Sequence, residues 1–407
     1  MKKLLIGITI SIIALTILSF CGHSNETGTF IHDEFPKPIG SYTVGRTQMD
    51  FKYNASDNSE RELTALFYYP SDSDEGKPTA EYAFPEFHSL RNELMVKIGN
   101  KNSDPLFESD FKTWSYEDVA LSEKETQYPV LFFSHGAGAY PDQGTLFAQD
   151  LASTGYIVVS VGHAETGVSK FIDGRVEGMS EEFMEDSKSY TTKFFLQIIP
   201  RLNIMSKKFD EEKAMKTSRK LTSTPEADNY SKYAVLQSED IRYVADNLYK
   251  MNTGDLDSMF EGRFQLDIGL GMFGHSFGGT TAAIVSRDDE RFIGSVNYDG
   301  NMVGALDSDF KKPFMQLGTV LAYNTNAFLL ESNSKDTYFA IVDDVTHSDF
   351  SDSLFTGTDK ERGERDALEQ RDILTSYTKA FFDKYMLKKD VEIEDLEFDG
   401  VEMIKKH

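Results

Sequence analysis

A glycine-rich stretch in the second half of the chain carries the clearest chemical signal. Residues 274–279 have the sequence GHSFGG, which contains the pattern Gly-X-Ser-X-Gly. This pattern places a serine hydroxyl at a sharp turn between a strand and a helix, where small neighbours relieve crowding. Apolar residues 270–273 precede the turn and a helix-forming run, residues 280–285, follows it. We therefore predict that Ser276 is a nucleophile that a histidine and a carboxylate elsewhere in the chain activate.

The histidine partner can be selected by its place in the chain. In proteins that carry this turn, the order is serine, then Asp or Glu, then histidine. Of the eight histidines, only His347 and His407 follow Ser276, and His407 is the last residue, where chains fray. His347 follows the apolar run 338–342, so we expect it on a loop at the same sheet edge as Ser276. His347 is the predicted general base.

The carboxylate must orient that histidine and stabilise its charged form. Asp299 lies just beyond the predicted strand 292–297, one helix and one strand after Ser276. We predict that it is the third member of the set. Asp343 and Asp344 are closer to His347 along the chain and remain alternatives.

An earlier loop has the composition needed to stabilise a negatively charged oxygen. Residues 134–139, SHGAGA, follow the apolar run 128–133, and their small side chains allow the backbone to approach a substrate. We assign the two oxyanion-hole donors to the backbone N–H groups of Ala137 and Phe277. The alternative is an ordinary glycine turn. His163 ends another apolar run, and a structural role is the expectation there.

These residues require a sheet to position them. Alternating residues 42–53 and 63–69 predict a hairpin, and residues 128–161 have the strand–helix–strand pattern of parallel strands. Further strands are predicted at residues 270–273, 292–297, 313–317 and 338–342, with a closing helix at 367–386. The sum is one α/β domain with antiparallel strands first and parallel strands after.

A charged, helix-prone segment, residues 165–235, interrupts the alternation of strands and helices. An apolar stripe within it comprises Phe194, Phe195, Ile198, Ile199 and Leu202. We expect the stripe to pack on the core or to form a lid. The alternative is that it docks on a lipid surface.

The net charge and the number of cysteines exclude some classes of partner and metal site. The 407 residues include 67 Asp and Glu against 42 Lys and Arg, for a net charge of −25, which makes nucleic acid an unfavourable partner. The chain has a single cysteine, Cys21, so neither an intramolecular disulfide nor a thiolate metal cluster can form. We expect no metal and no cofactor.

The N-terminus predicts export. Two lysines precede the mostly apolar residues 4–20, and a polar stretch begins after Cys21. Residues 18–21, LSFC, resemble a bacterial lipobox, in which the cysteine is lipidated. We expect a lipoprotein of the cell envelope held on the membrane through Cys21. An ordinary secreted protein and an uncleaved anchor are the alternatives.

Several of these segments together resemble the plasma-type platelet-activating factor acetylhydrolases, the calcium-independent group VII phospholipase A2 type. The segments are residues 40–45, 67–71, 128–139, 150–158, 274–279, 289–299 and 346–350. The resemblance covers residues 39–390. It implies an α/β-hydrolase fold with a mostly parallel central sheet, N-terminal antiparallel strands and an inserted helical segment.

The resemblance also implies an activity. It assigns Ser276, Asp299 and His347 to a catalytic triad and Ala137 and Phe277 to the oxyanion hole. The implied reaction removes short or oxidised sn-2 acyl groups from phospholipids without a metal. The chain departs from the family after His163, where residues 164–165, AE, stand in place of a basic residue, so the headgroup preference stays open.

Two other functions stay open beside this one. The first is a broad-specificity carboxylesterase of the cell envelope, and the second is a non-catalytic lipoprotein that binds a ligand. The expected organisation is a signal peptide and lipobox at 1–21, a tether at 22–38, a hydrolase domain at 39–390 with its insertion at 165–235, and a tail at 391–407.

Overall fold

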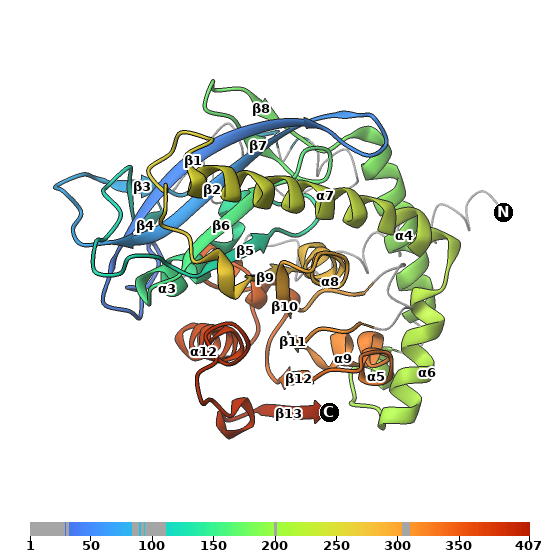
Figure 1. Cartoon of the computed structure of the whole chain (residues 1–407). Helices are drawn as coiled ribbons and strands as arrows, with labels where there is room; N and C mark the ends of the chain where they lie inside the picture. The colour runs from blue at the N-terminus through green and yellow to red at the C-terminus, as the bar shows by residue number, and fades with distance from the viewer. Residues whose placement is uncertain are drawn as a thin grey trace.

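The computed structural model describes residue 29, residues 32–83, 89, 90 and 93, and residues 111–198, 202–302 and 310–407. Within these ranges, eleven strands form one sheet. They are β1 (Thr43–Asn54), β2 (Glu60–Ser71), β3 (Thr79–Glu81), β4 (Lys112–Glu117), β5 (Val130–Ser134), β6 (Ile157–Gly162), β9 (Leu270–His275), β10 (Phe292–Tyr298), β11 (Phe314–Gly318), β12 (Thr337–Val342) and β13 (Val401–Lys406). Their order across the sheet is β13-β12-β11-β10-β9-β5-β6-β2-β1-β4-β3 (Figure 1).

The centre of the sheet is parallel. Each neighbouring pair from β6 through β5, β9, β10 and β11 to β12 runs in the same direction. β1 and β2 form the predicted hairpin, and β2 joins β6 antiparallel. The middle strands are almost uninterrupted apolar runs because helices cover both of their faces. The predicted fold class, with antiparallel strands first and parallel strands after, is confirmed.

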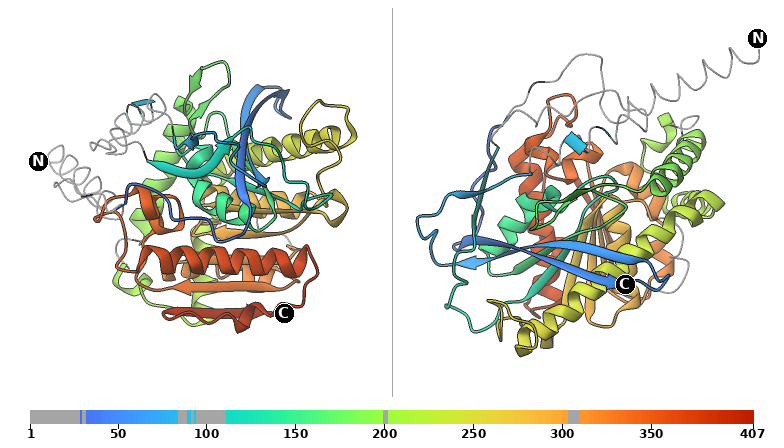
Figure 2. Two further views of the ribbon diagram at one scale, coloured as in Figure 1. Left: turned by 90° about the vertical axis from the view of Figure 1, so that its left-hand side faces the viewer. Right: turned by 90° about the horizontal axis from the view of Figure 1, so that it is seen from above.

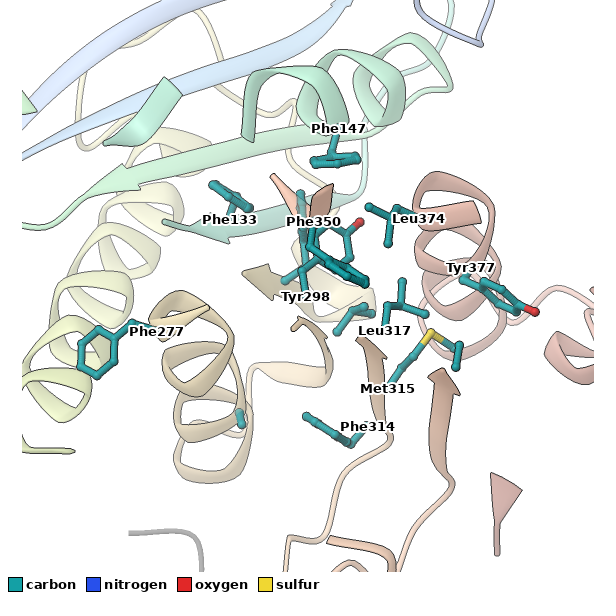
Figure 3. Close-up of a cluster of buried hydrophobic side chains, with 14 of the residues drawn as sticks. Phe133, Phe147, Phe277, Tyr298, Phe314, Met315, Leu317, Phe350, Leu374 and Tyr377 are labelled. Atoms are coloured by element: carbon teal, nitrogen blue, oxygen red, sulfur yellow. The ribbon is translucent and has the colours of Figure 1, made fainter. Parts of the chain in front are cut away.

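Helices cover the two faces of this sheet. They are α3 (Thr145–Ser153), α4 (Glu181–Ile198), α5 (Leu202–Met205), α6 (Glu211–Thr222), α7 (Pro225–Thr253), α8 (Phe277–Asp288), α9 (Val320–Asn326), α10 (Leu329–Ser332), α11 (Ser353–Thr356) and α12 (Ala367–Tyr385). Figure 1 shows α3 and α12 on one face and α7 and α8 on the other. Phe147 of α3 and Leu374 of α12 are buried in one core beside Tyr298 of β10 (Figure 3).

The segment 165–235 is helical for most of its length, but its edges differ from the expectation. It opens with a short hairpin of β7 (Ser169–Lys170) and β8 (Val176–Glu177). The helix α7 continues well past residue 235, and its Ile241, Val244 and Leu248 are buried against the sheet. The second half of α7 therefore belongs to the core of the α/β domain.

The apolar stripe on α4 is divided between core and surface. Phe194 and Ile198 are buried, whereas Phe195 is only half-buried. Ile199 lies outside the described residues. The two buried side chains support packing on the core for this part of the segment.

Both ends of the expected domain need correction. Phe35, inside the predicted tether, is fully buried, and its N–H donates to the carbonyl of Lys112, so the domain begins before residue 39. Residues 391–407, expected as a tail, include β13, which pairs antiparallel with β12. Figure 2 shows the C-terminus at the end of this edge strand. The signal peptide with Cys21, and the tether before residue 29, lie outside the described residues.

Candidate active site

Ser276 stands at a strained turn between β9 and α8. Its backbone has φ 55° and ψ −119°, in a region that costs a non-glycine residue about 1 to 3 kcal/mol. Close packing holds the turn in place, because a Cβ added to Gly278 would lie 2.0 Å from the carbonyl oxygen of Ser134. A Cβ on Gly274 would likewise lie 2.3 Å from the carbonyl oxygen of Gly278. These contacts explain why small residues flank the serine.

The structure brings together the three side chains that the sequence singled out. Ser276 Oγ lies 2.9 Å from His347 Nε2, and His347 Nδ1 lies 2.7 Å from Asp299 Oδ2. His347 opens the short 3-10 helix η5 (His347–Phe350) after β12, and Asp299 directly follows β10. The imidazole side chain is 49% exposed and the carboxylate is buried. A neutral ring with its proton on Nδ1 can therefore accept the serine proton at Nε2.

Asp299 is fixed by a second pair of bonds. The backbone N–H of Thr319 donates to Asp299 Oδ1 over 2.7 Å, and the Thr319 hydroxyl donates over 3.0 Å. These bonds leave Oδ2 for His347. The carboxylate that bonds to His347 is that of Asp299, and not that of either alternative, Asp343 or Asp344; the N–H of Asp343 donates to the carbonyl of Gly400.

The loop of residues 134–139, called here the 134–139 loop, runs beside the serine. A Cβ added to Gly136 would lie 3.2 Å from Ser276 Cβ, so backbone and nucleophile are close neighbours. Among the described residues, the N–H groups of Ala137 and Phe277 have no hydrogen-bond partner in the surrounding loops. The N–H of Phe277 also belongs to the first turn of α8, where the helix dipole favours negative charge.

His275 is a neighbour of the site whose contact the sequence did not reveal. Its Nε2–H donates to the carbonyl oxygen of His347 over 3.2 Å, and the two rings lie 4.7 Å apart. Burial, followed by the nearby His347, lowers the pKa of His275 well below its usual value, so its ring stays neutral. Its position inside the Gly-X-Ser-X-Gly pattern is the one signal that could have drawn attention to it.

Aromatic side chains from the inserted segment pack against Phe277, the residue that follows the nucleophile. The ring of Phe277 lies 4.6 Å from that of Tyr230 and 6.2 Å from that of Phe183. Met179 reaches the 134–139 loop, because a Cβ on Gly138 would lie 3.2 Å from its sulfur. Among the described residues, no group of three or more His, Cys, Asp or Glu side chains is arranged to hold a metal ion.

Comparison with known proteins agrees with this geometry. The profile of the family described as platelet-activating factor acetylhydrolase, isoform II, matches residues 27–402. The chain belongs to this family. The resemblance seen in the sequence is thereby confirmed, and the chain is a carboxylic ester hydrolase.

Alignments with individual members of the acetylhydrolase family cover most of this chain. It is 25% identical to the platelet-activating factor acetylhydrolase of Canis lupus familiaris, over 90% of this chain and 80% of that protein. It is 22% identical to the Gallus gallus protein of the same name, over 90% of this chain and 87% of the other. The fold is similar to a ferulic acid esterase from Streptomyces cinnamoneus, with a TM-score of 0.64 and 18% identity, over 92% and 99% of the two chains.

Proposed function

We propose that the protein hydrolyses carboxylic esters through an acyl-enzyme on Ser276. His347 takes the hydroxyl proton as Ser276 Oγ attacks the acyl carbon, and Asp299 stabilises the imidazolium. The N–H groups of Ala137 and Phe277 hold the oxygen that becomes negative. His347 returns the proton to the leaving alcohol, then activates the water that releases the acid.

One observation carries this proposal. The unbroken chain from Ser276 Oγ to His347 Nε2 and from His347 Nδ1 to Asp299 Oδ2, at 2.9 and 2.7 Å, is the geometry that proton transfer requires. A strained nucleophile and two free N–H groups beside it supply the remaining parts. A non-catalytic ligand-binding role has no use for this arrangement.

The first test is the variant Ser276→Ala with a chromogenic acetate ester. The substitution removes only the nucleophile, so we expect kcat to fall by about 10⁴-fold or more while Tm stays close to that of the wild type. A fluorophosphonate should label the wild-type protein at Ser276 and leave the variant unlabelled. Full hydrolysis by the variant would refute the mechanism.

For the substrate, we propose short or oxidised sn-2 acyl groups of phospholipids. Family membership supports this class, as does the apolar packing of Phe183 and Tyr230 on Phe277, the residue after the serine. A panel of esters graded in acyl length, with and without a phosphocholine headgroup, tests it. A preference for short acyl chains only when the headgroup is present supports the proposal. Indifference to the headgroup would favour a broad-specificity carboxylesterase.

We further propose that the enzyme is exported and held on the membrane by a lipid on Cys21. The apolar residues 4–20 and the single cysteine after them support this location. None of the helices in the described part of the chain is long and apolar enough to cross a membrane. Labelling with radioactive palmitate, compared between wild type and Cys21→Ser, tests the anchor. Equal labelling of the two would count against it.

A further inference from the structure

The side chain of His135 bonds to the peptide group that leads toward the nucleophile. His135 is fully buried at the end of β5. Its Nδ1 lies 2.8 Å from the carbonyl oxygen of Gly136, and the N–H of Ala139 donates to the same oxygen over 3.1 Å. This carbonyl and the N–H of Ala137 belong to one peptide group.

The planarity of that peptide links the two ends. In a trans peptide, the C=O and N–H bonds point in opposite directions, and the described chain contains no cis peptide. Because the two donors, His135 Nδ1–H and Ala139 N–H, fix the direction of the Gly136 C=O bond, the N–H of Ala137 must point in the direction opposite to these donors. That N–H has no partner among the described loops, and the neighbouring Gly136 lies against Ser276.

The tautomer of His135 is set by its surroundings. The backbone N–H of His163 donates to His135 Nε2 over 3.2 Å, so the ring proton must be on Nδ1, where it can donate to the Gly136 carbonyl. Burial, together with the nearby His163, lowers the pKa of His135 to about 3, so the ring keeps this single proton at working pH. A Cβ on Gly167 would lie 2.3 Å from the ring, which shows how tightly that side is packed.

A buried hydrogen-bonded chain fixes His163 in turn. Two nitrogens of Arg61 donate to the Asp240 carboxylate, each over 2.7 Å, and His163 Nδ1–H donates to it over 2.9 Å. His163 Nε2 then accepts the hydroxyl of Ser134 over 2.9 Å. The order Ser134–His163–Asp240 copies that of a catalytic triad, but all three side chains are fully buried and no substrate can reach them.

We propose that His135 is a positioning residue for ester hydrolysis: it clamps the Gly136–Ala137 peptide so that the Ala137 N–H faces the oxygen that becomes negative. The hydrogen bonds from Ser134 and to Asp240 fix His163, and the backbone N–H of His163 in turn fixes the ring of His135. This inference rests on the proposed function, because it assigns a purpose to the oxyanion-hole amide. It adds a residue that never touches the substrate.

Two amide substitutions separate the two contacts of the ring. In His135→Asn, the side-chain N–H₂ takes the place of Nδ1–H and keeps the bond to the Gly136 carbonyl. In His135→Gln, the side-chain oxygen takes the place of Nε2 and keeps only the bond from the His163 N–H. Both variants place a polar amide in the same buried space, so each serves as the stability control for the other.

We expect His135→Gln to lower kcat roughly tenfold to a hundredfold with KM nearly unchanged. His135→Asn should retain most of kcat even where its Tm falls as far as that of His135→Gln. The affinity of a trifluoromethyl ketone, which forms a negatively charged adduct on the serine, should fall in the same proportion as kcat/KM. Equal kcat losses in both variants, or an unaffected His135→Gln, would overturn the proposal.

A measurement on the wild-type protein keeps the inference testable if neither variant folds. Long-range ¹H–¹⁵N spectra of protein labelled with ¹⁵N-histidine report which ring nitrogen carries the proton. We expect His135 to carry it on Nδ1, and a proton on Nε2 would refute the clamp. If instead the wild type neither hydrolyses esters nor reacts with a fluorophosphonate, the proposed function fails, whatever the tautomer.

Discussion

At the scale of single residues, the carboxylate of Asp299 divides its two oxygens between two tasks. Oδ2 accepts from His347, and Oδ1 accepts from the backbone and the hydroxyl of Thr319. The same hydroxyl accepts the N–H of Ala322 and so caps α9. One side chain therefore orients the carboxylate and stabilises the helix that follows.

Replacing Thr319 by Val should separate these effects from the chemistry. The backbone N–H still donates to Asp299 Oδ1, so we expect kcat to fall only about three- to tenfold, with KM unchanged. Loss of the cap should lower the free energy of unfolding by about 1 kcal/mol. Steady-state kinetics and thermal unfolding measure the two effects.

Thr319→Ser is the matched control, because it keeps the hydroxyl and loses only a methyl group. It should retain wild-type kcat. If Thr319→Val and Thr319→Ser gave the same kcat, the hydroxyl would have no part in holding Asp299.

The sequence predicts residues of this site only where a local signal exists. Ser276 is marked by the glycines around it, and His347 and Asp299 each follow an apolar strand in the expected chain order. The buried hydrogen bonds that support the site, such as the one between Arg61 and Asp240, have no comparable local signal in the sequence. Arg61 and Asp240 are 179 residues apart in the chain, and nothing in the composition around either one indicates that they pair.

At the scale of elements, Asp352 joins the segment after His347 to the segment after the 134–139 loop. Its backbone N–H donates to the carbonyl of Gln143, and its Oδ1 accepts the N–H of Leu146 at the start of α3. Gln143 in turn accepts the N–H of Gly136 through its side chain. The segment that follows His347 and the 134–139 loop are thus tied together through Asp352, by its backbone N–H toward Gln143 and by its buried carboxyl group toward Leu146.

That tie should make stability depend on pH. Burial, with the nearby Asp142 adding to it, raises the pKa of Asp352 well above its usual value. The folded state then holds the proton more tightly than the unfolded state. From about pH 4, where the unfolded carboxyl ionises, stability should fall with rising pH until the folded pKa is passed.

Asp352→Asn removes this titration and keeps an oxygen for the N–H of Leu146. We expect the variant to gain stability relative to the wild type as the pH rises above the range in which the unfolded carboxyl ionises, because only the wild type must then release or retain a proton on this buried group. Thermal unfolding across a pH series measures it. A difference between the two proteins that stayed constant with pH would contradict the assignment.

The strands differ in how well they can be predicted from the sequence. Parallel strands such as β5 and β6 are continuous apolar runs beside turn residues, and this pattern predicts them within a few positions. The sequence of β13, VEMIKK, predicts no strand, because it mixes charged with apolar residues as an edge strand does. Its role depends on β12, which lies far away in the chain.

At the scale of the whole molecule, we expect the net charge to determine which lipid surfaces the enzyme can approach. The chain has 67 acidic and 42 basic residues and a net charge of −25. Unpaired carboxylates on the surface repel anionic headgroups over a distance that salt controls, about 30 Å at 0.01 M and about 10 Å at 0.1 M. A zwitterionic headgroup such as phosphocholine carries no net charge and is not repelled in this way.

An experiment with vesicles tests this effect of charge while the hydrolysed ester stays the same. The same short-chain phospholipid ester is presented in phosphatidylcholine vesicles or in phosphatidylglycerol vesicles, and initial rates are measured from low to moderate salt. On the anionic vesicles we expect the rate to rise severalfold with salt, because screening lets the enzyme reach the surface. On the zwitterionic vesicles, and on a dissolved acetate ester, the rate should stay level. A rate on anionic vesicles that fell with salt would mean that a local basic surface, and not the net charge, guides the approach.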